Sequence, residues 1–204
     1  MNSSDNKDHW ENVYETKNPD QVSWTQVKPQ TSLDFINALG LGKDAKIIDI
    51  GGGDSNLVDF LLDEGYENIT VLDISTKALE KAKERLGDAA LKVKWIATDI
   101  TVFEPTETYD IWHDRAAFHF MTKPEQVSKY IDIAEKNISG FMILGTFSKE
   151  GPKKCSGLDI QQYDENSLSE RFNAGFEKVK CITEDHTTPF GTIQNFVFCT
   201  FKKN

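Results

Sequence analysis

One stretch of this chain, residues 47–55 with the sequence IIDIGGGDS, constrains its fold more than any other. An apolar run leads directly into three glycines, and a second apolar run at residues 69–73 ends in Asp73. Glycines let the backbone approach a ligand closely, and a helix that starts after such a turn offers free N–H groups. The pattern predicts half of a nucleotide-binding α/β unit, in the order strand, turn, helix, strand.

The acidic residues around this turn indicate what kind of nucleotide it suits. Asp73 stands 22 residues after Gly51, where such units place an acceptor for the two ribose hydroxyls. Asn56 occupies the third glycine position of a dinucleotide fingerprint, and no lysine follows as in a phosphate-binding loop. Asp49 and Asp54 would repel phosphates. They suit a ligand with a positive end, such as S-adenosylmethionine, which has an ammonium and a sulfonium but no phosphate.

The rest of the chain alternates apolar runs with amphipathic segments, which predicts an α/β fold with a doubly wound, mostly parallel sheet. The last two strands have no full helix between them, so we expect them to pair antiparallel. We expect one domain over residues 1–204, with a Rossmann-like core at 30–204. The expected strands are 46–50, 69–73, 93–97, 109–113, 141–147, 176–182 and 196–201, and three expected helices are 30–39, 56–64 and 165–172. A further helix is expected between a cap at Ser75 or Thr76 and Gly87, and another from a capping box at residues 122–125 as far as Ile138.

Three motifs in this order resemble those of the class I S-adenosylmethionine-dependent methyltransferases. Residues 49–55 match the first motif except that Ser55 replaces its last glycine, Asp73 matches the second motif, and Asp99 matches the third. The resemblance covers roughly residues 30 to 200 and implies a seven-stranded sheet of order 3-2-1-4-5-7-6 with strand 7 antiparallel. The cofactor site that it implies comprises Asp49, Gly51, Gly52, Gly53, Ser55, Asp73, Ile74, Asp99, Ile100, His113 and Trp24.

Residues that follow the fourth expected strand should face the reactive end of such a cofactor. Asp114 and His119 are the candidates for orienting or deprotonating a methyl acceptor. Two structural alternatives stay open: Asp114 pairs with Arg115 or caps a helix, and His119 is a hydrogen-bonded core histidine. The loops that hold Cys155 and His186 open on the same edge of the sheet, so we expect them to form the walls of the acceptor site.

The sequence is compatible with more than one class of methyl acceptor. An acidic group beside it favours a nitrogen or oxygen acceptor, on a small molecule or on a protein side chain such as lysine. The length, the aromatic N-terminus and the run WHDR at 112–115 are similar both to thiopurine-methyltransferase-like enzymes and to compact protein-lysine methyltransferases. A non-catalytic S-adenosylmethionine-binding module and, less favoured, a nicotinamide-dependent oxidoreductase are the alternatives.

The first 29 residues are polar but carry three large aromatic side chains, Trp10, Tyr14 and Trp24. We expect a helix over residues 7–17 and a segment that closes over the cofactor as a lid. The alternative is a segment that docks permanently on the sheet, because either arrangement buries the aromatic surface.

The amino-acid composition indicates which partners and which cellular compartment are expected for this chain. The net charge of −10 repels phosphate backbones, which makes a nucleic-acid partner unlikely. Neither a membrane-spanning run nor a signal peptide is evident, and the three cysteines have no metal-like spacing. We therefore expect reduced cysteines, no metal, a cytoplasmic location, and a monomer or weak homodimer.

Overall fold

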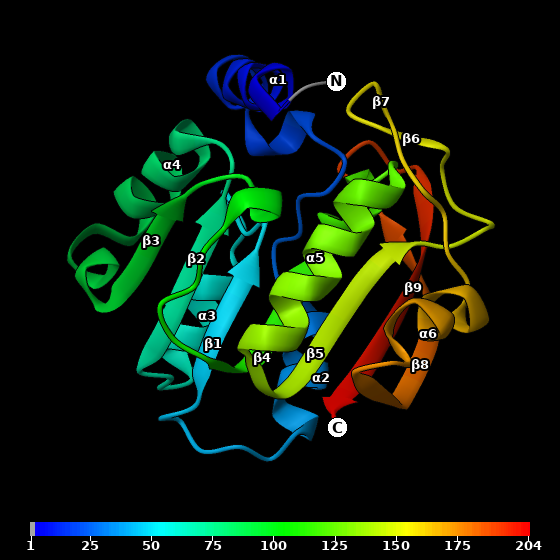
Figure 1. Cartoon of the computed structure of the whole chain (residues 1–204). Helices are drawn as coiled ribbons and strands as arrows, with labels where there is room; N and C mark the ends of the chain where they lie inside the picture. The colour runs from blue at the N-terminus through cyan, green and yellow to red at the C-terminus, as the bar shows by residue number, and fades with distance from the viewer. Residues whose placement is uncertain (1–2) are drawn as a thin grey trace.

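The computed structural model describes residues 3–204 and contains the expected sheet, in the order β3-β2-β1-β4-β5-β9-β8 (Figure 1). β1 to β5 run parallel, and β9 runs antiparallel to both β5 and β8. The predicted order is thereby confirmed, with β8 and β9 as the sixth and seventh strands. The strands are β1 (Lys46–Ile50), β2 (Asn68–Asp73), β3 (Val93–Ala97), β4 (Tyr109–Arg115), β5 (Ile138–Phe147), β8 (Phe176–Thr187) and β9 (Ile193–Lys203).

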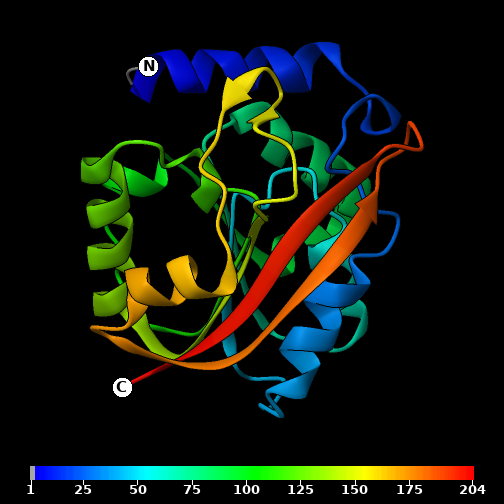
Figure 2. The ribbon, with the colours of Figure 1, turned by 90° about the vertical axis from the view of Figure 1, so that its right-hand side faces the viewer.

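Helices cover both faces of this sheet, because its central strands are apolar on both sides. Figure 2 shows the sheet between α5 and α6 on one side and α2 on the other. In β1, Ile48 and Ile50 belong to the core beneath α5 and α6, whereas Ile47 belongs to the core beneath α2, α3 and α4. The helices are α2 (Gln30–Ala38), α3 (Leu57–Asp63), α4 (Thr76–Leu86), α5 (Pro124–Asn137) and α6 (Glu165–Phe172).

The N-terminal helix α1 (Ser3–Thr16) lies across the carboxyl ends of the parallel strands, at the top of Figure 1. It starts earlier than the expected residue 7, and the first two residues of the expected lid segment lie outside the described residues. Within residues 3–204, no helix is long and apolar enough to cross a membrane.

The C-terminal hairpin is longer than its apolar residues indicate. β8 and β9 extend over residues 176–187 and 193–203, past the expected 176–182 and 196–201. Polar residues such as Asp185 and Gln194 fill the added pairs, because ladder hydrogen bonds join backbone groups whatever the side chain. A short hairpin of β6 (Lys154–Cys155) and β7 (Leu158–Asp159) occupies the segment that we expected to be a loop.

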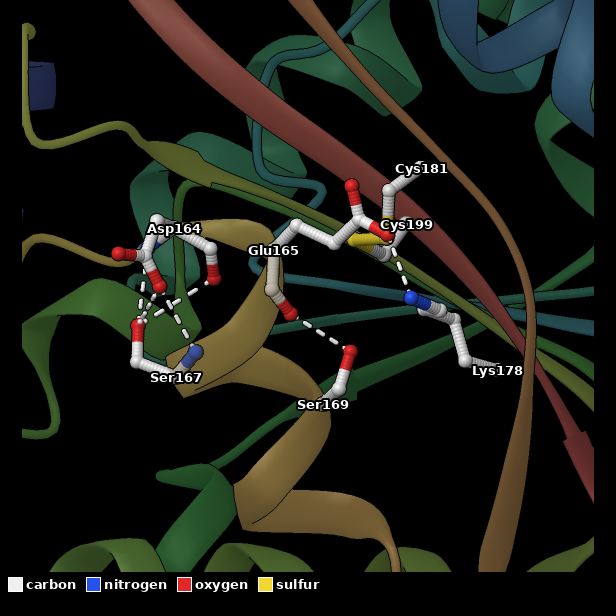
Figure 3. Close-up of a disulfide and its surroundings, with 7 residues drawn as sticks. All are labelled: Asp164, Glu165, Ser167, Ser169, Lys178, Cys181 and Cys199. Atoms are coloured by element: carbon white, nitrogen blue, oxygen red, sulfur yellow. Dashed lines mark hydrogen bonds and ion pairs between the residues drawn. A yellow bond between two sulfur atoms is a disulfide. The ribbon is translucent and has the colours of Figure 1, made fainter.

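Two cysteines of this hairpin form a disulfide, which corrects the expectation that all three are reduced. Cys181 in β8 and Cys199 in β9 are direct cross-strand partners with Cα atoms 4.1 Å apart, within disulfide reach (Figure 3). Cys155 is the free, buried cysteine of the described chain. The cysteine content therefore gives no support to a reducing compartment.

Counting thiols tests this disulfide. Unfolding the chain without reductant should expose one reactive thiol, and unfolding it with reductant should expose three, as measured with a chromogenic thiol reagent. Replacing Cys181 with serine should lower the free energy of unfolding by about 2–4 kcal/mol, because the bond closes a loop of 18 residues. Three thiols in the non-reduced, unfolded chain would contradict the bond.

Candidate active site

A cavity of about 1110 Å³ opens at the carboxyl ends of the central parallel strands. It lies where β1 has β2 on one side and β4 on the other, which is where open α/β sheets bind their ligands. The volume is at the upper end for small-molecule sites, so the cavity has room for a cofactor and a second small molecule. Of the expected cofactor residues, all but Gly53 line it: Asp49, Gly51, Gly52, Ser55, Asp73, Ile74, Asp99, Ile100, His113 and Trp24.

The glycine turn after β1 needs its glycines for two different reasons. Gly51 and Gly53 have positive φ angles of 67° and 44°, which strain other residues. Gly52 is packed instead: a Cβ there would lie 2.5 Å from Asp49 Oδ2 and 2.8 Å from Val71 Cγ1. The turn therefore brings bare backbone to the cavity wall, as close approach to a ligand requires.

Asp73 ends β2 beside this turn and is almost fully buried. Its Oδ1 accepts a hydrogen bond of 2.8 Å from the backbone N–H of Ser75, and its Oδ2 lies against Gly53. Burial raises the pKa of Asp73 to about 7, and the negative charges of Asp49 and Glu11 add to the rise. Hydroxyl donors from a ligand would relieve this cost, since they favour the ionised carboxylate.

Asp49 and His113 form a buried pair on neighbouring strands. They are register partners in β1 and β4, and His113 Nδ1 lies 2.7 Å from Asp49 Oδ1. The other ring nitrogen, Nε2, lies 2.9 Å from the hydroxyl of Ser32 in α2. This geometry fits an imidazole that donates from Nδ1 and accepts at Nε2, so both ring nitrogens are used within the protein. The hydrogen bond between Asp49 and His113 therefore holds their side chains in place where they line the cavity.

The third motif residue also has a local structural task. Asp99 Oδ1 accepts hydrogen bonds of 2.8 Å from both the backbone N–H and the hydroxyl of Thr101, which starts a short 3₁₀ turn. Ile100 follows it at the cavity wall and is buried. The turn presents Asp99 and Ile100 together at the end of β3.

The two expected catalytic residues do not reach the cavity. Asp114 is fully buried: its Oδ1 accepts from the N–H groups of Ala117 and Phe118 at 2.9 and 3.1 Å, and its Oδ2 accepts from Tyr130 at 2.7 Å. Burial raises the pKa of Asp114 to about 6. The cap alternative describes this geometry, because Asp114 holds the turn after β4 and leaves no oxygen facing an acceptor.

His119 is likewise a core residue. Its ring packs against Phe120 and Phe147 and is fully buried. The backbone N–H of Phe147 points at Nδ1 from 3.4 Å, and Nε2 has no partner. Burial, followed by the positive charge of Arg115, lowers the pKa of His119 to about 3, so the imidazole is neutral near pH 7.

An aromatic cluster from the N-terminal segment roofs the cavity. The ring of Trp10 contacts those of Tyr14, Trp24 and Phe120, with centroids 6.3, 5.6 and 5.2 Å apart. All four residues line the cavity. Trp24, expected at the cofactor, thus lies in this roof. The contact fits a lid and a permanent dock equally well.

Glu11 of α1 anchors that roof to α4. Its carboxylate accepts hydrogen bonds of 2.8 and 3.0 Å from the backbone N–H groups of Thr76 and Lys77, and one of 2.9 Å from the hydroxyl of Ser75. These are free donors at the start of α4, so α1 supplies a cap from a distant part of the chain. No sequence pattern signals this contact, because capping motifs join neighbouring residues.

Arg115 of β4, Cys155 of β6 and His186 of β8 also line the cavity. The structure thus brings the two expected wall residues to the cavity, together with Arg115. Arg115 does not pair with Asp114, as one alternative expected, but donates to the carbonyl of Trp24 at 2.9 Å. Strand periodicity could have found it, because Arg115 shares a face of β4 with His113. Among the described residues, no three ligand-type side chains gather as a metal site requires.

Comparisons with known proteins agree with this architecture. A family model described as a methyltransferase domain matches residues 47–135. A malonyl-[acyl-carrier protein] O-methyltransferase of Anoxybacillus flavithermus is 33% identical over 126 residues, which cover 58% of this chain and 47% of that protein. An eEF1A lysine and N-terminal methyltransferase of Mus musculus is 27% identical over 125 residues, which cover 59% of this chain and 17% of that protein. The chain thus spans half or less of the curated relatives it matches.

Solved structures share the fold over nearly the whole chain. A SAM-dependent methyltransferase from Anabaena variabilis superposes with a TM-score of 0.78 at 15% identity, covering 100% of this chain and 96% of that one. The N-methyltransferase NodS from Bradyrhizobium japonicum, in complex with S-adenosyl-L-homocysteine, gives a TM-score of 0.72 at 15% identity, covering 100% and 99%. At such identities the likeness concerns the fold.

The pKa of Asp73 predicts how cofactor binding should depend on pH. Ribose hydroxyls donate to the ionised carboxylate, so affinity for S-adenosylhomocysteine should be full above about pH 7 and should fall as the pH drops below it. Replacing Asp73 with asparagine should weaken binding at pH 8 at least tenfold, roughly the value of one charge-assisted hydrogen bond, and should flatten the pH profile. Titration calorimetry from pH 5.5 to pH 8.5, with the exposed Asp132→Asn as the matched control, measures both effects. A wild-type profile that stays flat would rule out this role.

Limited proteolysis separates a lid from a permanent dock. Glu11→Ala removes the cap on α4, worth about 1 kcal/mol, so trypsin should cut near Lys17 several times faster in this variant. Glu15→Ala is the control, because Glu15 makes only an exposed ion pair with Lys77. S-adenosylhomocysteine should slow the cut in the wild type if α1 is a lid. Equal rates with and without it would favour the dock.

Proposed function

We propose that this chain is a class I S-adenosylmethionine-dependent methyltransferase, as its matched domain and its fold support, and that it transfers a methyl group to a nitrogen or oxygen acceptor. The observation that carries the proposal is one cavity lined by residues from strands on both sides of β1. Asp73 and the glycine turn line it at β2 and β1, and Arg115 of β4 and His186 of β8 line it on the other side. A cofactor and an acceptor can therefore meet inside it.

The residues present fit S-adenosylmethionine. A side chain at position 52 would collide with Asp49, so the turn presents only backbone at this position. Asp73 would hold the ribose hydroxyls, and Asp99 and Ile100 would lie at the adenine. Asp49 and His113 would lie near the end of the cofactor that carries the ammonium and the sulfonium. When bound, the cofactor supplies an electrophilic methyl group on its sulfonium.

The protein's part in the reaction is to hold the acceptor in line, to exclude water, and to take a proton where the acceptor must lose one. His186 replaces Asp114 as the candidate for that proton. Its Nε2 lies 2.8 Å from the carbonyl oxygen of Ser23, which requires the proton on Nε2 and leaves Nδ1 free to accept one. Burial, and after it the charge of Arg115, lowers the pKa of His186, so the ring is neutral near pH 7.

The aromatic roof favours a small-molecule acceptor, because Trp10, Trp24 and Phe120 cover the cavity that a protein side chain would have to enter. A protein lysine is the second candidate, supported by the relative named for lysine and N-terminal methylation of eEF1A. The net charge of −10 argues against nucleic acid. One domain, with residues 30–204 as its core, a cytoplasmic location and a monomer or weak homodimer complete the proposal.

Transfer of a labelled methyl group tests it. The protein is incubated with S-adenosylmethionine carrying a radioactive methyl group and with a cell extract separated by filtration into small molecules and proteins. We expect label in the small-molecule fraction with the wild type and at least tenfold less with Asp73→Asn. Label only in the protein fraction would favour the lysine acceptor. No transfer despite cofactor binding would favour the non-catalytic module.

A further inference from the structure

Arg115 lines the cavity with a buried guanidinium whose donors the protein satisfies only in part. The guanidinium of Arg115 uses Nη1 to donate to the carbonyl of Trp24 at 2.9 Å. Its Nε and Nη2 are buried from solvent and have no hydrogen-bond partner. The ring of Phe196 lies 5.0 Å from the guanidinium carbon, and it offers only a weak cation–π contact. Donors left unsatisfied in this way are costly and are usually accounted for by a missing partner.

No carboxylate bonds directly to the guanidinium of Arg115 among the described residues, although the negative charges of Glu184 and Asp49 are near enough to raise its pKa. His119 and Cys155, with pKa values of about 3 and about 12, are both neutral near pH 7. The carboxylate of Glu184 is hydrogen-bonded to the hydroxyl of Thr31, and that of Asp49 to His113. Burial lowers the pKa of Arg115 only to about 10, so the guanidinium stays charged. Arg115 thus keeps its charge and two buried donors without a direct ion pair among the described residues.

The free edge of Arg115 has a particular shape. The Nε–H and one Nη2–H point the same way and form the fork that binds the two oxygens of a carboxylate side by side. The neighbouring cavity wall is largely apolar, with Trp24, Phe120 and Pro189. An anionic head on an apolar body would satisfy both surfaces.

We propose that Arg115 binds a carboxylate on the methyl acceptor, which is a small carboxylic acid with an apolar or aromatic body. This inference rests on the proposed methyltransferase function. The cofactor itself also carries a carboxylate, in its methionine part. The position of Arg115 favours the acceptor, because it contacts Trp24 and Phe196 of β9. β9 lies beyond β5, on the side of β4 away from β1, whose Asp49 would meet the methionine part.

Binding of matched acids and amides to the protein loaded with S-adenosylhomocysteine tests the proposal. The probes are benzoate with benzamide and phenylacetate with phenylacetamide, measured by titration calorimetry. In the wild type we expect each acid to bind at least tenfold more tightly than its amide. Arg115→Met, which keeps the length of the side chain without its charge, should abolish that preference. Arg115→Lys should keep part of it, since an ammonium lacks the fork.

The controls separate this proposal from the function on which it rests. Lys129→Gln removes one positive charge from an exposed site on α5 and should leave the preference unchanged. Melting curves and affinity for S-adenosylhomocysteine verify the folded site, and that affinity should stay within threefold of the wild type in every variant. Failure of the wild type to bind S-adenosylhomocysteine would refute the proposed function itself.

Any of three outcomes would overturn the role of Arg115 alone. The first is that the acids bind no better than the amides, or do not bind at all. The second is that the preference for acids survives in Arg115→Met or is lost equally in Lys129→Gln. The third concerns the cofactor. Arg115→Met weakens S-adenosylhomocysteine tenfold or more, which would assign the guanidinium to the carboxylate of the cofactor.

Discussion

The pairing of β1 with β2 on one side and with β4 on the other is the constraint on which the rest of this structure depends. Asp49 lies opposite Val71 in β2 and opposite His113 in β4, so one strand end joins the two halves of the cavity. Chain connections leave in opposite directions from this point, and the cavity lies where they separate. The glycine turn can approach a ligand only because those neighbours hold β1 in place.

The sequence predicts the part of the cavity at β1 and β2 well, because the patterns that indicate it are local. Apolar runs, the glycine turn and an aspartate at the end of β2 lie within 30 residues of one another. Each has one physical meaning in a parallel sheet, where every strand end reaches the same edge. The strand order follows from the family resemblance, and the antiparallel final strand also follows from the short link before it.

The part of the cavity beyond β4 depends on tertiary contacts that no local sequence pattern contains. Successive residues of β4 face opposite sides: Asp114 turns toward Tyr130 of α5, whereas His113 and Arg115 turn toward the cavity. Which side holds the cavity is a tertiary property, so the sequence alone does not tell which of these side chains line it. The disulfide likewise needs the register of β8 on β9, and Glu11 needs the position of α1 over α4. Long-range contacts of this kind decide the acceptor site.

The central claim is that the strand ends at β1, β2 and β3 bind S-adenosylmethionine beneath α1. Hydrogen–deuterium exchange with and without S-adenosylhomocysteine tests it most directly, because it reports backbone protection segment by segment. The account predicts slower exchange in residues 51–56, 73–76 and 98–101 and in α1, with the α6 and β8–β9 regions unchanged. Protection confined to other segments, or none at saturating ligand, would contradict it.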